Sequence, residues 1–302
     1  MVKNDELYFA NEAQAKRYAT LNVIKLIVIY FFLVLGALFT LLPFYWMIAT
    51  SLKDAVEITT TSNFFPANPW ENGVLNYTEV FTKTGSASDG YVTLLDCVKN
   101  TILVGVLTTI GTVCTTVLSA FAFSRLEFKG RELIFSILLA TMMIPGEMMI
   151  ITNFETISTL DWLDTYQALI IPFCASVFYT FFLRQTFLQI PNELYYAAKV
   201  DGKSDFGYLF KVMIPIARPT IISITILSMI GSWNAYIWPR TVSANKKLVT
   251  DGIMSLFQSM EGGESSHVVM AAATVVAIPL LLTFICFKKY IMRGVGRSGI
   301  KG

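Results

Sequence analysis

Charged residues are scarce in this chain. Only 15% of its 302 residues are Asp, Glu, Lys or Arg, whereas soluble domains carry about 25%. Hydrophobic residues make up 54% of the chain, and the mean hydropathy is +0.58. A soluble fold of this length could not bury so much apolar surface. The composition therefore excludes a soluble globular protein and indicates an integral membrane protein.

Cysteine and histidine are also scarce. Cys97, Cys114, Cys174 and Cys286 are widely spaced without a Cys-x-x-Cys pair, and His267 is the single histidine. This spacing excludes a disulfide framework and a metal site. The sequence also lacks the Gly-x-x-x-x-Gly-Lys-Ser/Thr pattern that binds nucleotide phosphates. The chain is therefore expected to bind no cofactor of its own and to catalyse no reaction by itself.

Long apolar runs predict the membrane segments. A spanning helix needs about 20 mostly apolar residues. Six runs come close to that length or exceed it: Leu26–Ser51, Thr101–Phe123, Leu133–Ile151, Ala168–Leu183, Thr220–Trp238 and Val268–Phe287. The first run is too long for a signal peptide, and no small-residue cleavage site follows it. We expect an all-α integral membrane fold with six transmembrane helices.

Lysine and arginine predict the orientation. If the N-terminus is cytoplasmic, 17 of the 23 basic residues lie in segments on the inner side of the membrane. An excess of basic residues marks cytoplasmic loops. Both termini and the loop of residues 185–219 are therefore predicted to be cytoplasmic. Residues 52–100 and 240–266 are predicted to form outer loops, the first one irregular.

The loop of residues 185–219 carries the signals of a short first helix. Pro191 stops the preceding segment, and Asn192 is expected to cap a helix over about residues 193–200. Gly202 is placed as the glycine that follows the helix C-terminus.

A second short helix is expected directly after the first. Ser204 can cap it, and Pro215 is expected to end it. Its apolar residues recur at one helical face: Phe206, Leu209, Phe210 and Met213. We call residues 192–215 the bracket. The pattern alone fits a compact cytoplasmic bracket of two helices and a connector lying on the membrane equally well.

Several segments resemble one protein family. The bracket run reads Ile190-Pro191-Asn192-Glu193-Leu194-Tyr195-Tyr196-Ala197-Ala198-Lys199-Val200-Asp201-Gly202 and continues to Met213-Ile214-Pro215. In order and spacing it resembles the Glu-Ala-Ala loop of bacterial ABC importer permeases of the carbohydrate, maltose-transporter type. Four other segments resemble the same family: Gly231-Ser232-Trp233-Asn234 through Trp238-Pro239, Met143-Ile144-Pro145, Asn76-Tyr77-Thr78 and the ending Gly299-Ile300-Lys301-Gly302.

The resemblance implies a function and a set of partners. It implies the permease subunit of an ATP-driven sugar importer in the cytoplasmic (inner) membrane of a bacterium, with a cytoplasmic two-helix coupling loop. The implied partners are a second homologous permease, an ATPase dimer that binds ATP and Mg, an extracellular sugar-binding protein and membrane lipid, but no nucleic acid. The implied organisation is a cytoplasmic arm (1–20), a first helix with its outer loop (21–94), a permease domain (95–289) and a cytoplasmic tail (290–302).

The resemblance also assigns residues of the bracket to ATPase docking: Glu193, Tyr196, Ala197, Ala198, Asp201, Gly202, Phe206, Ile214 and Pro215. Tyr196 departs from the family because it replaces the glutamate of the Glu-Ala-Ala sequence. A charge-assisted contact between that acid and a basic residue of the ATPase cannot form here. Ala197 and Ala198 still allow close approach.

Two groups of residues are candidates for the substrate path. One combines aromatic faces with an amide that is costly to expose to lipid: Trp233, Asn234, Tyr236 and Trp238. The other is a stripe of small and polar residues on the second predicted span: Gly105, Thr108, Thr109, Thr112, Thr115, Thr116 and Ser119. Small residues favour helix packing in membranes, and the alternative is that this stripe lines a water-filled path.

Two other protein classes fit the sequence poorly. A secondary transporter uses acids or bases at mid-membrane for ion coupling. Here Glu147 is the one acid well inside a predicted span, in its outer part. An intramembrane enzyme needs a nucleophile with a base, or metal ligands, and His267 alone does not supply them.

Overall fold

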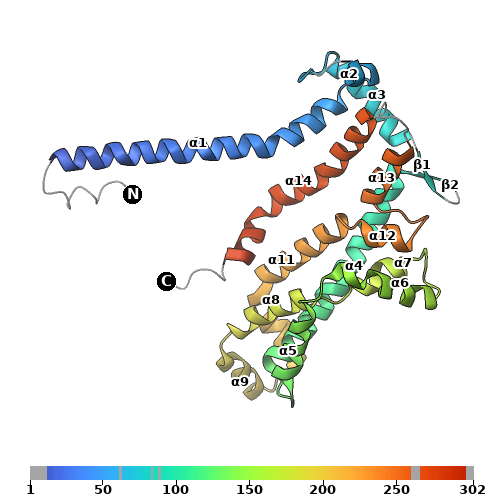
Figure 1. Cartoon of the computed structure of the whole chain (residues 1–302). Coiled ribbons are helices and arrows are strands. Elements are labelled where there is room, and N and C mark those ends of the chain that lie inside the picture. The colour runs from blue at the N-terminus through green and yellow to red at the C-terminus, as the bar shows by residue number, and fades with distance from the viewer. Residues whose placement is uncertain (1–11, 61–62, 83, 88–89, 260–265, 297–302) are drawn as a thin grey trace.

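The structure is a computed structural model that describes residues 12–60, 63–82, 84–87, 90–259 and 266–296. Helices account for nearly all of this part of the chain (Figure 1). The first eleven residues of the expected arm and the terminal Gly299-Ile300-Lys301-Gly302 lie outside the described residues.

The expectation of six membrane segments is confirmed. In the described residues, five helical stretches are long and apolar enough to cross a membrane: Lys16–Ser51, Leu94–Arg125, Tyr166–Leu188, Asp205–Trp233 and Ser266–Tyr290. A sixth is the bent pair Arg131–Thr141 and Gly146–Thr159, if the two helices form one span. The chain is therefore an all-α integral membrane protein.

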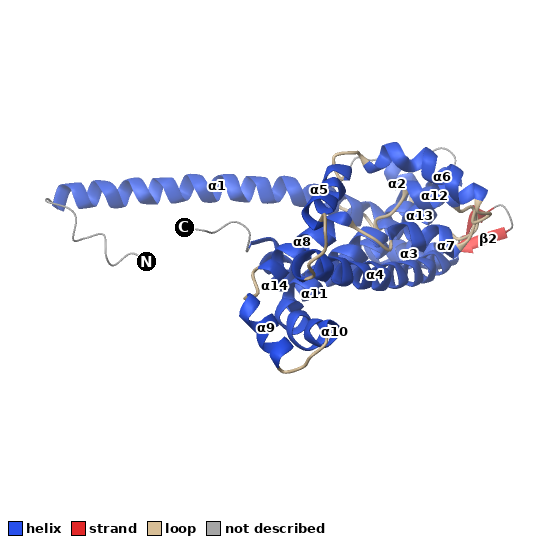
Figure 2. Cartoon of the chain, turned by 90° about the horizontal axis from the view of Figure 1, so that it is seen from below, coloured by secondary structure: helices blue, strands red, loops and turns tan. Residues whose placement is uncertain are grey.

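Helix α1 (Glu12–Ser51) stands apart from the rest of the molecule over most of its length (Figures 1 and 2). It begins inside the segment expected to be a polar arm, and none of its most apolar window is buried. Near its C-terminal end it meets helix α14 (Ser266–Gly296). The C-terminal end of α1 is also held by Asn76, whose side-chain amide donates to the carbonyl oxygens of Ser51 and Lys53 at 2.9 and 2.8 Å.

The centre of the molecule is a bundle around helix α4 (Leu94–Arg125). Helices α8 (Val177–Leu188) and α11 (Ile214–Trp233) pack on α4, and α14 packs on α11. The polar stripe of α4 faces this packing: Thr109 donates to the Ser228 hydroxyl at 3.2 Å, and Thr112 donates to the Phe173 carbonyl at 2.7 Å. The hydroxyls of Thr109 and Thr112 thus find partners on neighbouring elements instead of lipid.

The third and fourth expected spans are each broken. Helix α5 (Arg131–Thr141) and the pair η2 (Gly146–Met149) and α6 (Ile150–Thr159) meet at 88°, because Pro145 cannot continue a helix. The fourth span consists of α7 (Tyr166–Ile170), the 3₁₀ turn η3 (Ile171–Phe173) and α8. Ser176 restarts it, accepting from the Tyr179 amide at 3.3 Å as the N-cap of α8.

The fifth span ends earlier than expected. Helix α11 stops at Trp233, and a separate helix α12 (Ile237–Val242) carries Trp238. The expectation of one helix through Trp238 is therefore wrong. Pro239 explains the difference, because in a continuous helix its ring would clash with the Ala235 carbonyl and it has no N–H to donate.

The predicted outer loops hold more structure than expected. They contain α2 (Ala55–Thr60), α3 (Pro69–Thr82), a hairpin of β1 (Thr84–Ala87) with β2 (Gly90–Thr93), and α13 (Val249–Ser259). The two strands are antiparallel, with Thr84 opposite Thr93. Figure 1 places these elements at the end of the bundle opposite to helix α9 (Asn192–Val200).

At that same end, Asp164 joins two turns that are far apart in sequence. Its carboxylate accepts from the Ser243 hydroxyl at 2.7 Å and from the Asn245 backbone and side-chain amides at 3.0 and 2.8 Å. Asp164 and Asp161 both have positive φ, 58° and 56°, which aspartate tolerates better than most residues. Burial raises the pKa of Asp164, but these hydrogen bonds outweigh it and lower that pKa to about 2.

Candidate functional site

The bracket begins with helix α9, and its first residue does not act as expected. Pro191 is the N-cap, and Asn192 is already helical with no capping bond. The Asn192 side chain instead accepts a hydrogen bond from the Arg125 guanidinium at the end of α4. The prediction of Asn192 as the N-cap is therefore wrong, because its side-chain oxygen is occupied by this cation.

Gly202 ends α9 as predicted. Its φ is +72°, in the left-handed region that favours glycine. The Gly202 amide donates to the Lys199 carbonyl at 3.0 Å, and the Lys203 amide donates to the Ala198 carbonyl at 2.9 Å. These two bonds form a Schellman motif, which satisfies carbonyls at the helix end. Asp201 is the C-cap residue.

The second half of the bracket begins as expected and ends differently. The Ser204 hydroxyl caps helix α10 (Asp205–Tyr208), accepting from the Gly207 amide at 3.1 Å. A π-helical turn, η4 (Leu209–Met213), follows, and α11 continues from it without a break. Pro215 therefore does not end the helix. It sits in the first turn of α11, and the wider π turn before it accommodates a residue that cannot donate.

The apolar residues of the bracket separate into two sets. Tyr208, Leu209 and Met213 are fully buried and join Ala198 in a core cluster with residues of α4 and α8. Phe206 and Phe210 are 63% and 59% exposed. The expectation of one shared apolar face is therefore wrong, because α10 and η4 together bury Leu209 and Met213 and leave the two phenylalanines exposed.

The nine candidate docking residues lie together at this end of the bundle, where α9 and α10 project side by side (Figure 2). Ala198 is buried and Ile214 is half-buried, while the other seven are exposed: Glu193, Tyr196, Ala197, Asp201, Gly202, Phe206 and Pro215. Val200, 89% exposed, was not among the predicted residues. The bracket thus exposes four large apolar side chains, Tyr196, Val200, Phe206 and Phe210, which we together call the bracket surface.

Two sets of contacts hold the bracket in place. Within it, Lys199 pairs with Asp205 at 2.7 Å and the Tyr195 hydroxyl donates to the same carboxylate at 2.7 Å. Toward the bundle, the buried Arg125 donates to Asn192 and to the carbonyl oxygens of Phe187 and Ile190. The end of α8 and the start of α9 are thus fixed to α4 by one side chain.

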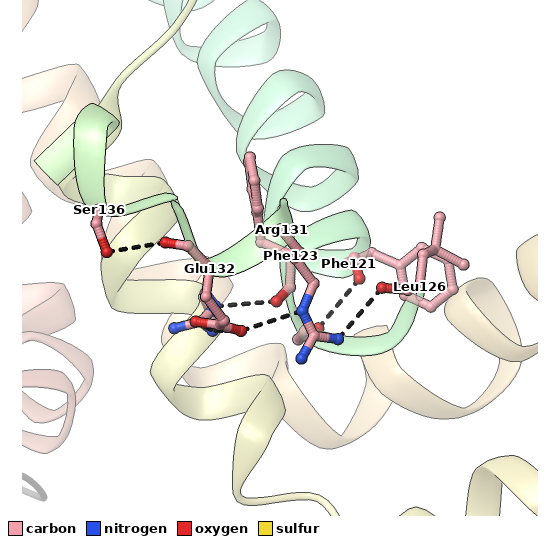
Figure 3. A network of polar contacts seen from close by, with 8 residues as sticks. Phe121, Phe123, Leu126, Arg131, Glu132 and Ser136 are labelled. Carbon is pink, nitrogen blue, oxygen red and sulfur yellow. Dashed lines mark hydrogen bonds and ion pairs between the residues drawn. The ribbon is translucent and has the colours of Figure 1, made fainter. Parts of the chain in front are cut away.

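A second polar joint connects α4, α5 and α8 close to the bracket (Figure 3). Arg131 donates to Glu132 at 3.0 Å and to the Leu126 carbonyl at 3.2 Å. From α8, Arg184 donates to both carboxylate oxygens of Glu132 at 2.8 Å and to the Phe123 carbonyl at 3.0 Å. The Arg184 guanidinium also lies 4.2 Å from the centre of the Phe135 ring. Three helices therefore meet at one carboxylate.

The four residues predicted for the substrate path do not form one cluster. Trp233 is buried among residues of α13 and α14, whereas Trp238 is buried in a separate cluster with α6 and α7. Asn234 is exposed, and its side chain donates to the Ile230 carbonyl at 3.0 Å. Tyr236 is half-buried, with the Arg240 guanidinium 5.8 Å from its ring centre. Of these four, Trp238 lines a cavity between α4 and α12, and the other three do not line that cavity.

That cavity has a volume of about 350 Å³ and lies between α4, η3, α8, α11 and α12. Its walls carry hydroxyl groups and aromatic rings, and none of the fourteen lining residues is charged. Thr108 and Thr112 reach it from the polar stripe of α4. The stripe therefore serves helix packing and also lines a cavity, so both interpretations made from the sequence describe part of it.

Sequence reasoning missed the contribution of the broken fourth span to this cavity. Phe173, Ala175 and Ser176 line it. The signal was present, because Pro172 interrupts the apolar run and Ser176 is a good N-cap.

Within the described residues, no group of three or more His, Cys, Asp or Glu side chains could hold a metal ion.

Apolar helices, two broken spans and an uncharged internal cavity define a polytopic membrane transport protein. The chain belongs to the family of binding-protein-dependent transport system inner membrane components, which residues 101–297 match.

Curated relatives span most of the chain. The chain is 29% identical over 283 residues to the arabinooligosaccharides transport system permease protein AraQ of Bacillus subtilis, covering 93% of this chain and 97% of the relative. It is 31% identical over 284 residues to the trehalose/maltose transport system permease protein MalG of Thermococcus litoralis, covering 93% and 99%. It is 32% identical over 198 residues to the sn-glycerol-3-phosphate permease protein UgpE of Pectobacterium atrosepticum, covering 65% and 70%.

A solved structure has the same fold. A chain of a bacterial ABC transporter that imports the acidic polysaccharide alginate aligns with a TM-score of 0.75 at 23% identity, covering 93% of this chain and 99% of that chain. The fold of the chain is thus that of an ABC importer permease.

Proposed function

We propose that this chain is a permease subunit of an ATP-driven importer of sugars or oligosaccharides and forms half of its translocation path. The observation that carries the proposal is the match of residues 101–297 to the binding-protein-dependent family, together with relatives named for arabinooligosaccharides and for trehalose and maltose. The helical bracket at one end of an apolar helical bundle agrees with this function.

The bracket is the proposed docking site for a separate ATPase. Four large apolar side chains, Tyr196, Val200, Phe206 and Phe210, are exposed on a rigid two-helix element outside the apolar bundle. Exposed apolar groups gathered on one surface indicate a protein interface. ATP and Mg would bind to the partner, because this sequence has no phosphate-binding loop.

Tyr196 gives this proposed interface an apolar character. It is 62% exposed and stands near Val200 on α9, so an aromatic ring replaces the glutamate of the family at the proposed contact. Aromatic residues are enriched in the cores of protein interfaces. The ATPase would therefore meet a ring at this position instead of a carboxylate.

The other proposed partners correspond to other surfaces. A second homologous permease and lipid would cover α1, whose most apolar window is unburied in this chain. An extracellular sugar-binding protein would meet the opposite end of the bundle from α9, where α3, α13 and the hairpin lie. The proposed orientation in the inner membrane has both termini and the bracket in the cytoplasm, as the basic residues favour.

The test is purification of the complex from its native membrane with this chain as the tagged subunit. We expect an ATPase and a second permease to co-elute. ATP hydrolysis should disappear when the ATPase subunit is removed, because this chain has no nucleotide site. Elution of the chain without an ATPase, together with unchanged sugar uptake in cells that lack the ATPase, would contradict the proposal.

A further inference from the structure

We propose that the 350 Å³ cavity between α4, η3, α8, α11 and α12 is a binding site for one uncharged sugar ring inside this chain. The inference rests on the proposed function and deepens it, since it places a substrate site in this subunit. Small-molecule sites usually have volumes of about 300–1,000 Å³, with a few polar groups among apolar walls. The cavity therefore has room for a single ring and not for a whole oligosaccharide.

A buried hydroxyl without a partner lies in the wall of this cavity. Thr108 lines the cavity, is 4% exposed, and its hydroxyl makes no hydrogen bond in the structure. Buried polar groups are almost always paired, so an unpaired one needs a reason. Its neighbours on α4 are paired: Thr112 donates to Phe173 and Thr109 donates to Ser228. The Thr108 hydroxyl is covered in this rotamer, and a turn of the side chain to the other rotamer that helical threonine adopts would bring it to a polar ligand in the cavity.

Other groups around Thr108 suit a ring of hydroxyls. Ser228 accepts from Thr109, and Ser176 accepts from the Tyr179 amide, so each of these two hydroxyls keeps its own proton to donate. Donors and acceptors thus come from α4, α8 and α11. Such a mixed set fits sugar hydroxyls, because each of them both donates and accepts.

An aromatic face is fixed in the same wall. The Trp238 indole N–H donates to the Ala168 carbonyl at 2.9 Å, which uses its one polar group outside the cavity. Phe173 meets the Trp238 ring edge-on, with ring centres 6.0 Å apart. A ring held in this way offers its apolar face to the C–H groups of a sugar.

The absence of charge among the lining residues predicts which solutes are accepted. A carboxylate or phosphate placed in this cavity would lose water and gain no cation, which is strongly unfavourable. Relatives of this chain are named for neutral arabinooligosaccharides and for sn-glycerol 3-phosphate, and a similar structure imports an acidic polysaccharide. The cavity is therefore expected to accept uncharged sugars and to exclude solutes that carry a carboxylate or a phosphate.

Thr108→Val tests the hydroxyl, with Thr116→Val as its matched control. Thr116 lies on the same helix, is 1% exposed and also has an unpaired hydroxyl, but it does not line the cavity. Both variants keep the shape of the side chain and remove one buried polar group. The full complex is reconstituted in liposomes, and maltotriose and arabinotriose imported per ATP hydrolysed are measured. We expect Thr108→Val to lower this ratio about fivefold, as loss of one hydrogen bond implies, and Thr116→Val to leave it unchanged.

Gly231→Leu tests the space, with Gly36→Leu as its control. A Cβ added at either glycine meets nothing within 4 Å, so both backbones accept a side chain at its first carbon. Gly231 lines the cavity, whereas Gly36 lies on α1. We expect Gly231→Leu to abolish sugar import at normal ATPase activity, while Gly36→Leu behaves as wild type.

The outcomes separate the cavity from the proposed function. If wild-type complex imports maltotriose or arabinotriose and the two cavity variants match their controls, the cavity is not a sugar site and the proposed function stands. If the wild-type complex, with active ATPase, imports no sugar from the panel, the proposed function fails and the cavity inference fails with it. Import of glycerol 3-phosphate or an alginate trisaccharide at the rate of the neutral sugars would refute the selection of uncharged rings.

Discussion

Arg125, at the last residue of α4, donates a hydrogen bond to the side chain of Asn192, at the first residue of α9. The same guanidinium donates to the backbone of Phe187 and Ile190. The guanidinium has five donors in a fixed planar arrangement, so it holds these three acceptors with less loss of freedom than a flexible lysine would. The start of the bracket is therefore fixed to helix α4 by this side chain.

Replacement of this guanidinium should loosen the bracket. Arg125→Met leaves the carbonyls of Phe187 and Ile190 without their partner, at about 1–3 kcal/mol each. We expect reduced recovery of the ATPase in a pull-down at equal membrane abundance. Arg218→Met is the control, because Arg218 is an exposed cation near the same end. Equal recovery with both variants would show that Arg125 does not position the bracket.

The joint at Glu132 predicts unequal effects of its two partners. The Arg184 side chain is 9% exposed and the Glu132 side chain is 62% exposed. Glu132→Gln should lower stability by less than about 1 kcal/mol, since water screens the exposed carboxylate. Arg184→Met also removes the bond to Phe123 and the contact with the Phe135 ring, so we expect about 1–3 kcal/mol. Thermal unfolding in detergent measures both, and equal shifts would contradict the asymmetry.

Gly202 predicts a purely conformational effect. Its φ of +72° is strained for other residues, yet an added Cβ meets no atom within 4 Å. Gly202→Val should therefore cost about 1–2 kcal/mol through the backbone alone and misdirect α10. Gly202→Asn is the matched control, because asparagine tolerates the left-handed region. We expect ATPase recovery to fall for valine and to persist for asparagine. Similar losses for both would mean that this backbone conformation does not shape the bracket.

The contacts of Asp164 predict a dependence on acid pH. Its folded-state pKa of about 2 lies below the usual value of aspartate, so its charged form stabilises the fold above about pH 4. This stabilisation is lost as the pH falls toward 2. Asp164→Asn should remove it at all pH values, and the difference in melting temperature from wild type should shrink below pH 4. A difference independent of pH would show that the charge of Asp164 contributes nothing.

Cysteine labelling tests the orientation. Lys203→Cys in the bracket and Glu71→Cys in α3 are both exposed positions at opposite ends of the bundle. In intact cells, a membrane-impermeant maleimide should label position 71 and not position 203, whereas position 203 should react after lysis. Labelling of position 203 before lysis would reverse the predicted topology.

Composition and residue type predicted the fold well. Apolar runs of about 20 residues, Gly202 and Ser204 each depend on local chemistry, and the structure places them as expected. The breaks at Pro145 and within the fourth span were missed because hydropathy averages over a window and cannot see where a helix bends. Pro215 was misjudged because a preceding π turn, which depends on tertiary packing, accommodates it.

The candidate site was less predictable. Periodicity grouped Phe206 and Leu209 on one face, but the packing of α10 on α4 and α8 buries only Leu209. The four aromatic and amide residues near Trp233 are close in sequence, yet the helix end at Asn234 directs their side chains into different clusters. The cavity depends on which helices meet, and a single sequence without contacts does not contain that information.

The uninterrupted path from α10 through η4 into α11 makes residues 205–233 one rod, about 44 Å long at 1.5 Å per residue. Phe206, on the bracket surface, lies near one end of this rod, and Gly231 and Ser232, which line the cavity, lie near the other. A π turn and Pro219 lie within this path, but it stays helical throughout and can therefore act as a lever. A tilt of about ten degrees at the bracket would move the cavity end by several ångströms. A partner docked on the bracket could therefore displace residues of the cavity wall.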